Sequence, residues 1–454
     1  MRGGWTEKLG VIGILLETCF PMRGGRMERV GVIGIFPRIC FPMRGGDPSN
    51  GSIRTGKSGR IIMKIVKRRL ISCIIAAALL LSGCGKAGAG NNTGGGSHAA
   101  AGAGSDSNAG TGAEVPELSY ATMFSVSDYE GCSLVDIRDE GQFLVVPEGK
   151  EVPESVPEGA VVLKQPLRHV YVASTPAMDL IDAAGGLGQV AFSCLKAEDW
   201  YVDDAREAME SGAITYAGKY SKPDYEMLLS GGCDLAIENT MIYHSPQVKE
   251  KLEELGIPVL VERSSYEDDP LGRLEWMKLC GVLFGEETAA DAFFQEEEAR
   301  VQPLLLAQST GRTVAFFSVT SGGAVTVHKP GGYIAKMIEY GGGVYALNGL
   351  AISSGDQNAL STMHVQMEDF YREAKDCDVL IYNSAIEGQI RSISDLVARN
   401  SVLADFAAVK SGQVYCTDAD FFQCVTSSCD FILDVNRILT GDNPDNLLTM
   451  EKLS

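Results

Sequence analysis

The sequence is poor in the residues and motifs that usually mark a catalytic centre. It has five histidines and three tryptophans among 454 residues, and no C-x-x-C pair, no G-x-S-x-G and no H-E-x-x-H. The chain therefore lacks the cysteine spacings that are usual in zinc and redox sites. It also lacks the commonest local signatures of serine hydrolases and zinc peptidases. Four histidines follow residue 114, which leaves a serine triad open, but no motif indicates one: His169, His244, His328 and His364.

Basic residues are scarce once the first 83 residues are set aside. Of 39 basic and 59 acidic residues, 14 and 4 precede Cys84, which leaves 25 and 55 and a net charge of −30. So acidic a chain argues against nucleic acid or anionic lipid as a partner. It suits a soluble protein held beside a membrane.

Residues 63–83 have the order of regions that an export signal needs. Four basic residues within 63–69 are followed by the apolar run LISCIIAAALLL and then by Leu81-Ser82-Gly83-Cys84. Twelve apolar residues extend only about 18 Å as a helix, too short for a bilayer core that takes roughly 20 residues. The pattern predicts a signal peptide. Because Cys84 follows Leu-Ser-Gly directly, the site resembles the lipobox of bacterial lipoproteins, which implies cleavage before Cys84 and diacylglycerol on its thiol.

The segments on either side of this signal are not expected to form a core. MRGG recurs at Met1, Met22 and Met43, and this 21-residue repeat suggests translated tandem-repeat DNA upstream of the working start at Met63. After Cys84, residues 85–114 are mostly Gly, Ala, Ser and Asn. Such a composition predicts a flexible tether with an r.m.s. reach of roughly 30 Å.

Eight cysteines follow Cys84, and an even number in an exported protein permits disulfides. They are scattered through apolar stretches, which favours buried thiols over bridges. Cys424 and Cys429 are the pair with the best chance of pairing. The eight are Cys132, Cys194, Cys233, Cys280, Cys377, Cys416, Cys424 and Cys429.

Strand-like and helix-like patterns alternate along the rest of the chain, which indicates parallel β-α-β units. The predicted strands cover residues 142–146, 169–173, 214–217, 234–237, 258–261, 313–319, 379–382 and 413–415, and the predicted helices residues 176–184, 225–230, 247–255, 334–339 and 427–439. The alternation breaks at residues 271–308, where two long helical patterns are separated by Gly285. We therefore predict an α/β fold of two Rossmann-like lobes, residues 115–270 and 309–454, bridged by one long helix within 271–308.

Several short stretches resemble the substrate-binding proteins of ABC importers for iron chelates and cobalamin. They occur in the family's order: Tyr220 to Glu226 followed by CDLAI, then LGIPV at 255–259, then GGY at 331–333 with GGG at 341–343, and finally Met367-Glu368 followed by DCDVLI at 376–381. Cys233 and Cys377 replace the family's proline at two strand entries, which does not threaten the fold.

The resemblance implies a non-catalytic receptor on the outer face of the cell membrane, anchored by lipid. It would capture a metal chelate, most readily a ferric siderophore, with cobalamin or haem as alternatives, and deliver it to an ABC permease and its ATPase. We expect a monomer that needs no cofactor. The alternative from another class is a lipid-anchored surface hydrolase.

Glu226 and Glu368 are the residues to which the resemblance gives the sharpest role. In the family, one exposed glutamate on each lobe pairs with arginines of the membrane subunits. Two carboxylates fixed on two rigid lobes would read the distance between the lobes, and arginine offers them a planar, permanent charge.

Ligand contacts are expected from loops at the carboxyl ends of the strands, as in open α/β sheets. Aromatic rings with a few cations suit a large, often anionic chelate. One histidine, His244, makes no metal site, and Arg273 and Trp276 are read as packing or capping residues. The candidates are Ser174, Thr175, Lys219, Tyr220, Asn239, Tyr243, His244, Arg263 and Tyr266 from the first lobe, and Tyr333, Asn383, Phe421, Phe422 and Gln423 from the second.

Overall fold

The computed structural model describes residues 115–351, 361–444 and 446–454, together with the backbone of two short strands, β1 (Leu15–Thr18) and β2 (Val30–Ile33), which pair antiparallel. The chain divides into two units, 1–104 and 105–454. The predicted signal peptide, lipid site at Cys84 and tether lie outside the described residues.

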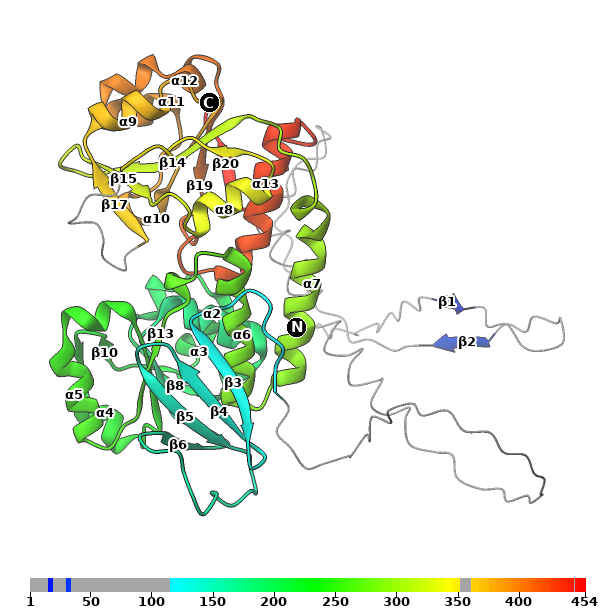
Figure 1. Cartoon of the computed structure of the whole chain (residues 1–454), viewed down its shortest axis with the longest axis vertical. Helices are drawn as coiled ribbons and strands as arrows, with labels where there is room; N and C mark the ends of the chain where they lie inside the picture. Colours follow the sequence, from blue (N-terminus) through cyan, green and yellow to red (C-terminus); the bar gives the residue numbers. More distant parts are fainter. Residues whose placement is uncertain (1–14, 19–29, 34–114, 352–360, 445) are drawn as a thin grey trace, which may run out of the picture. The chain divides into compact units, whose positions relative to one another are not determined.

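The first lobe of the larger unit has a five-stranded parallel sheet (Figure 1). Its order is β13-β12-β7-β8-β9, and its strands are β7 (Val170–Val172), β8 (Val190–Ser193), β9 (Thr215–Tyr216), β12 (Leu235–Asn239) and β13 (Val259–Glu262). Both faces are covered, because Val170 and Val172 pack with one apolar cluster while Tyr171 between them packs with another. Burial on both faces explains why the sequence of these strands is nearly continuous in apolar residues.

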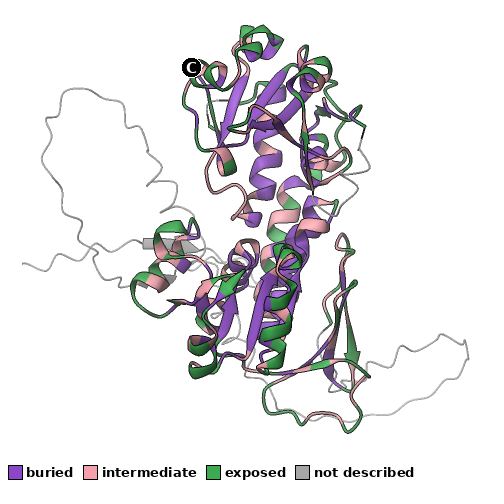
Figure 2. Cartoon of the chain, turned by 90° about the vertical axis from the view of Figure 1, so that its left-hand side faces the viewer, coloured by how far each residue is buried: buried purple, intermediate pink, exposed green. Residues whose placement is uncertain are grey.

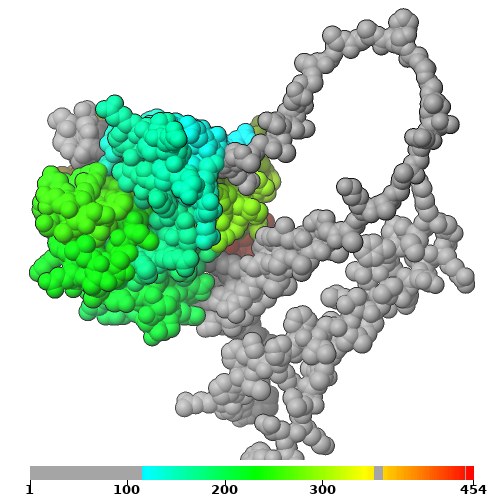
Figure 3. All heavy atoms as spheres, turned by 90° about the horizontal axis from the view of Figure 1, so that it is seen from below, coloured from blue at the N-terminus to red at the C-terminus, as the bar shows by residue number. Residues whose placement is uncertain are grey.

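Helices and a second sheet cover the two faces. The helices are α2 (Thr175–Ala184), α3 (Asp203–Glu210), α4 (Tyr225–Ser230) and α5 (Pro246–Glu254), and a small hairpin is formed by β10 (Gly218–Lys219) and β11 (Lys222–Pro223). The second sheet has the order β3-β4-β5-β6, with strands β3 (Phe124–Tyr129), β4 (Cys132–Ile137), β5 (Gly141–Val146) and β6 (Val161–Lys164). In Figure 3 the cyan-to-teal segment that contains this sheet forms one side of the lobe, next to the green segment of α4 and α5.

Two long helices follow the first lobe. α6 (Pro270–Phe284) is buried along its whole length, and α7 (Glu287–Leu305) follows the left-handed Gly285. The 19 residues of α7 span about 28 Å, and this helix contacts α2 of the first lobe and both α8 and α13 of the second. It is therefore the bridging helix that the sequence predicts.

The second lobe has one mixed sheet of seven strands. Its order is β17-β15-β14-β18-β19-β20, and β16 pairs with β14. The strands are β14 (Thr313–Val319), β15 (Val325–His328), β16 (Val344–Tyr345), β17 (Thr362–Val365), β18 (Val379–Tyr382), β19 (Val414–Thr417) and β20 (Met450–Lys452), and the helices are α8 (Tyr333–Tyr340), α9 (Met367–Ala374), α10 (Ser384–Glu387), α11 (Ile393–Arg399), α12 (Ala407–Lys410) and α13 (Ser428–Thr440). Figure 2 shows the buried strands between helices whose outer faces are exposed.

The chain enters the folded unit through a segment held by two buried carboxylates. The amides of Ser119, Tyr120 and Ala121 donate to Glu275 of α6 over 2.8–3.1 Å, and those of Thr122 and Met123 donate to Glu267 over 2.8–3.0 Å. These bonds replace the water that the extended backbone and the two carboxylates lose on burial. We call residues 117–123 the entry strap.

No disulfide joins the eight cysteines after Cys84 in the described residues: seven are buried thiols and Cys424 is half-buried. The preference for buried thiols is confirmed, and Cys424 and Cys429 are not bridged. Within the same residues, no helix combines the length and the apolar character needed to cross a membrane.

Candidate functional site

The carboxyl ends of the strands of the two lobes meet at a direct contact. Gln423, in the loop after β19, accepts a hydrogen bond from the Tyr201 amide at 3.0 Å and donates one to the Asp199 carbonyl at 2.9 Å, in the loop after β8. A second contact joins α2 to the turn η6 (Val425–Ser427), where Thr426 donates through its amide and hydroxyl to Asp179 over 2.8–3.0 Å. The loops expected to carry the site therefore face each other across the lobes.

Two predicted site residues of the first lobe hold the strand ends in place. Ser174 is fully buried, donates to Glu262 at 2.9 Å and caps α2. Asn239 donates to the Ala173 carbonyl at 2.7 Å and caps the short helix η3 (Thr240–His244). These side chains join the carboxyl ends of β7, β12 and β13 and keep the loops in position.

Three other predicted residues lie together at the carboxyl edge of the first lobe's parallel sheet, next to the turn between β4 and β5: Arg263, Tyr266 and Tyr243. Arg263 lies 4.8 Å from the Tyr266 ring, donates to the Arg138 carbonyl and pairs with Asp139 at 3.2 Å. The Tyr243 hydroxyl donates to Glu140, and burial together with this contact raises the pKa of Tyr243. Arg263 thus has a counter-charge, although its Nε is buried without a hydrogen-bond partner in the described residues, and part of the Tyr243 ring is exposed.

The other first-lobe candidates lie along the same edge. Lys219 is exposed and Tyr220 half-buried in the β10–β11 hairpin, Thr175 is half-buried at the start of α2, and His244 is exposed at the end of η3. Among the described residues, no three His, Cys, Asp or Glu side chains are grouped closely enough to hold a metal ion.

The second-lobe candidates form an aromatic floor. The Phe421 ring lies 5.4 Å from Phe316 and 5.7 Å from Phe422, and Phe422 lies 6.1 Å from the buried His328. Tyr333 is buried, and its ring lies 5.2 Å from that of His328. Asn383 is also buried, where it caps α10.

Three exposed apolar side chains at the same strand ends are absent from the predicted set. Tyr201 after β8 is 50% exposed, Met241 after β12 is 42% exposed, and Ile386 after β18 is 60% exposed. Exposed apolar groups beside aromatic rings are typical of surfaces that bind large ligands. All three follow the carboxyl end of a strand, so position alone includes them in the set of candidate ligand contacts.

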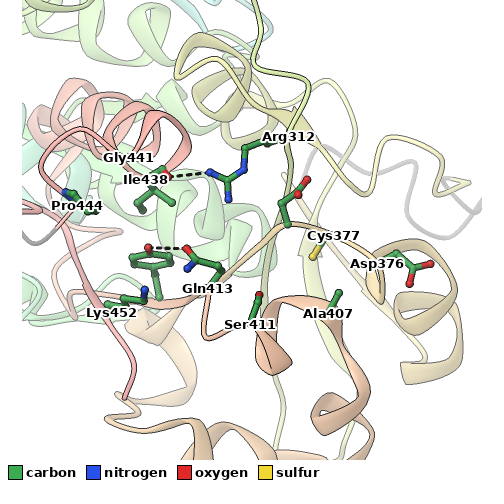
Figure 4. Close-up of a pocket in the computed structure, with 12 residues that line it drawn as sticks. Arg312, Asp376, Cys377, Ala407, Ser411, Gln413, Ile438, Gly441, Pro444 and Lys452 are labelled. Carbon is green, nitrogen blue, oxygen red and sulfur yellow. Dashed lines mark hydrogen bonds between the residues drawn. The ribbon is translucent and has the colours of Figure 1, made fainter.

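A wide pocket of about 570 Å³ lies at the opposite edge of the second lobe (Figure 4). Its walls include Arg312, Cys377 and Gln413. These residues lie just before the amino ends of β14, β18 and β19, respectively. Arg312 points to the carboxyl end of α13, where it donates to the carbonyls of Ile438 and Leu439 at 3.2 and 2.9 Å. Because its arginine is committed to a helix end, this pocket is a poorer candidate than the strand-end loops.

Glu226 and Glu368 occupy corresponding places in the two lobes. Each is the second residue of a helix, α4 or α9, and the next strand, β12 or β18, pairs with the first strand of the lobe's main sheet, β7 or β14. A helix that returns the chain to a parallel strand begins at the carboxyl edge of the sheet, so both side chains lie at the edges where the lobes face each other. Both are exposed, and within the described residues neither has a hydrogen-bond or ion-pair partner. Figure 1 shows α4 and α9 on the side away from α7.

Residues 172–421 match the family described as periplasmic binding protein, from within β7 to the loop after β19. The chain belongs to the periplasmic binding protein family. This span includes α4, α6, α7 and α9, whereas the β3–β6 sheet precedes it. The resemblance to chelate-binding proteins of ABC importers is confirmed at the level of the family.

Two relatives and one solved structure extend this result. An uncharacterized lipoprotein of Methanocaldococcus jannaschii is 26% identical over 314 residues, which cover 66% of this chain and 72% of the relative. A second uncharacterized lipoprotein of the same organism is 25% identical over 320 residues, covering 67% and 77%. The crystal structure of a periplasmic binding protein from Veillonella parvula has a TM-score of 0.51 at 16% identity and covers 70% of this chain and 98% of its own. The predicted two-lobed α/β fold is confirmed.

Proposed function

We propose that this periplasmic binding protein is the extracytoplasmic substrate-binding lipoprotein of an ABC importer. Lipid on Cys84 would anchor it, residues 85–114 would tether it, and the facing strand-end loops would bind a metal chelate. A ferric siderophore is the first candidate, with cobalamin and haem as alternatives. The surface hydrolase gains no support from the family, whose solute-binding members are not enzymes.

The paired position of Glu226 and Glu368 carries the proposal. An exposed carboxylate in the first turn of a helix is stabilised by the helix dipole and needs no partner within the protein. Having the same unpaired group on both lobes suits a partner that touches both lobes at once, and arginines on two membrane subunits would provide the complementary charge. The two relatives named as lipoproteins support the anchor at Cys84.

The docking role is tested by reversing both charges with Glu226→Lys and Glu368→Lys. We expect uptake of the chelate to fall to background while the affinity of the purified protein for it stays unchanged, because Glu226 and Glu368 lie on α4 and α9 and not among the aromatic rings of the floor. Glu253→Lys and Glu339→Lys are the matched control, since both glutamates are exposed on helices, α5 and α8, outside the proposed docking positions. Uptake that survives the double reversal, or affinity that falls with it, contradicts the assignment.

The ligand class is tested by titrating the purified chain with ferric siderophores, cyanocobalamin and haem and following tryptophan fluorescence. Trp200 is the neighbour of Tyr201 at the lobe contact, and Trp276 lies one helical turn from Arg273. Saturable quenching without any product supports a receptor. Turnover of an ester or a glycoside by the pure protein would favour the hydrolase instead.

A further inference from the structure

Arg273 is a buried cation at the junction of the two lobes. It lies in the first turn of α6, only 7% of its surface is exposed, and its guanidinium carbon lies 3.9 Å from the centre of the Tyr333 ring at the start of α8. Helix α6 is capped by Asp269, so Arg273 is not a capping residue. Within the described residues its Nε is buried and has no hydrogen-bond partner, as is also true of the Arg263 Nε.

No carboxylate lies within 4 Å of the Arg273 guanidinium in the described part of the chain, although the protein is strongly acidic. The other buried cations are paired there: Lys278 with Glu275 at 3.2 Å and Arg263 with Asp139 at 3.2 Å. A buried charge without a counter-charge is strongly unfavourable. Stacking on a single tyrosine ring offsets only part of that cost.

The side chains around the Arg273 guanidinium come from the second lobe. A cavity of about 10 Å³, enough for one water-sized group, is lined by Arg273, Tyr333, Phe421 and Ser427 among others. The His328 ring packs against that of Tyr333, and its Nε2 is buried and has no hydrogen-bond partner in the described part of the chain. Burial and the nearby Arg273 lower the pKa of His328 to about 3, so the ring is neutral near pH 7 and adds no second charge.

We propose that Arg273 is the counter-charge for an anionic oxygen of the bound chelate, so that the receptor selects chelates carrying free carboxylates. One ligand oxygen would enter the cavity and accept hydrogen bonds from the guanidinium, while the body of the chelate lies against Phe421 and Phe422. This inference rests on the proposed receptor function and narrows its ligand class. In a protein whose mature chain carries a net charge of −30, a buried arginine offers an anion a favourable place that most of the surface does not.

The inference is tested by binding four probes to the purified full-length chain: ferric citrate and haem, which carry free carboxylates, cyanocobalamin, which carries no free carboxylate, and ferrioxamine B, which is a cation. We expect the wild type to prefer at least one carboxylate probe. Arg273→Met should weaken that binding by about 10- to 100-fold, as expected for lost charge-assisted hydrogen bonds. Arg273→Lys should retain part of the affinity, and Tm should be unchanged or higher in the methionine variant because an unpaired buried charge is removed.

Arg168→Met is the control, because Arg168 is exposed before the amino end of β7, at the edge away from the facing loops. Three outcomes overturn the inference. One is unchanged carboxylate-probe affinity in Arg273→Met, another is a wild type that binds only cyanocobalamin or ferrioxamine B, and the third is a lower Tm with equal losses for all probes in both Arg273 variants. A wild type that binds none of the four probes counts against the proposed receptor function itself, which separates the two failures.

Discussion

Replacing Glu238 by glutamine should make the protein more stable at neutral pH. Glu238 is on β12, whose residues alternate between the two faces of the sheet: Leu235 and Ile237 face α2 and α6, while Ala236 and Glu238 face α4 and α5. The side chain is fully buried, and neither carboxylate oxygen has a hydrogen-bond partner among the residues that the structure describes. Burial therefore raises the pKa of Glu238 from 4.5 to about 8.

This shift fixes the sign and the size of the effect. Below pH 4.5 the carboxyl is protonated in both the folded and the unfolded chain, so it carries no pH-dependent penalty. Between pH 4.5 and 8 the unfolded chain releases the proton while the folded chain keeps it, so the free energy of unfolding falls as pH rises. The slope for one such group is about 1.4 kcal/mol per pH unit, which amounts to about 3 kcal/mol between pH 5 and pH 7.

The measurement is urea unfolding of the wild type and of Glu238→Gln from pH 5 to pH 8. We expect the variant to gain stability over the wild type at about 1.4 kcal/mol per pH unit up to the folded-state pKa. Glu253→Gln serves as the control, because Glu253 is exposed on α5 and its change should leave the slope unaltered. A stability difference between Glu238→Gln and the wild type that does not vary with pH would refute the reasoning.

Three further predictions concern the folded unit. Glu275→Gln should lower the free energy of unfolding by about 3 kcal/mol, because a buried carboxylate that binds the Ser119–Ala121 amides and Lys278 is lost. Hydrogen exchange of these amides should become faster. Unchanged exchange would mean that the entry strap is held by other contacts. Gly341→Ala should lower the free energy of urea unfolding by about 1–3 kcal/mol, since the new Cβ would lie 2.6 Å from Val435 in α13. An unchanged unfolding midpoint would show that α8 and α13 can move apart without loss of stability. In the folded chain iodoacetamide should reach Cys424 before the seven buried thiols, whose modification should require unfolding, and rapid labelling of Cys280 would contradict the packing of α6.

The bridging helix is among the more predictable parts of the fold. The pattern predicts it within residues 271–308, and the structure has α7 at Glu287–Leu305. The buried parallel strands β7, β12, β13, β14, β18 and β19 were also found within two residues, because each is a compact apolar run. The sequence does not predict the parallel strand β8 or the antiparallel strands β15, β17 and β20. These strands have only three or four residues, and polar residues interrupt or end them, so pairing with neighbouring strands defines them.

The candidate site was less predictable than the fold. The strand-end rule placed Gln423 and Phe421 in the correct loop, but it could not distinguish Ser174, which is buried and bonded to Glu262, from Tyr201, which is half-exposed at the lobe contact. Burial of a polar residue depends on which neighbour accepts its hydrogen bond. That neighbour is commonly tens of residues away in the chain.

The sequence by itself determined the order of strands and helices, the long bridging helix and the acidic character of the chain, because these depend on local periodicity and composition. Only the tertiary structure decided which charges have partners. Arg273 and Arg263 look alike in the sequence, yet Arg263 meets Asp139 from a turn more than a hundred residues earlier, while Arg273 lies on the ring of Tyr333 from the second lobe and has no carboxylate partner in the described residues. Electrostatic satisfaction is a property of non-local neighbours, so no reading of adjacent residues reveals it.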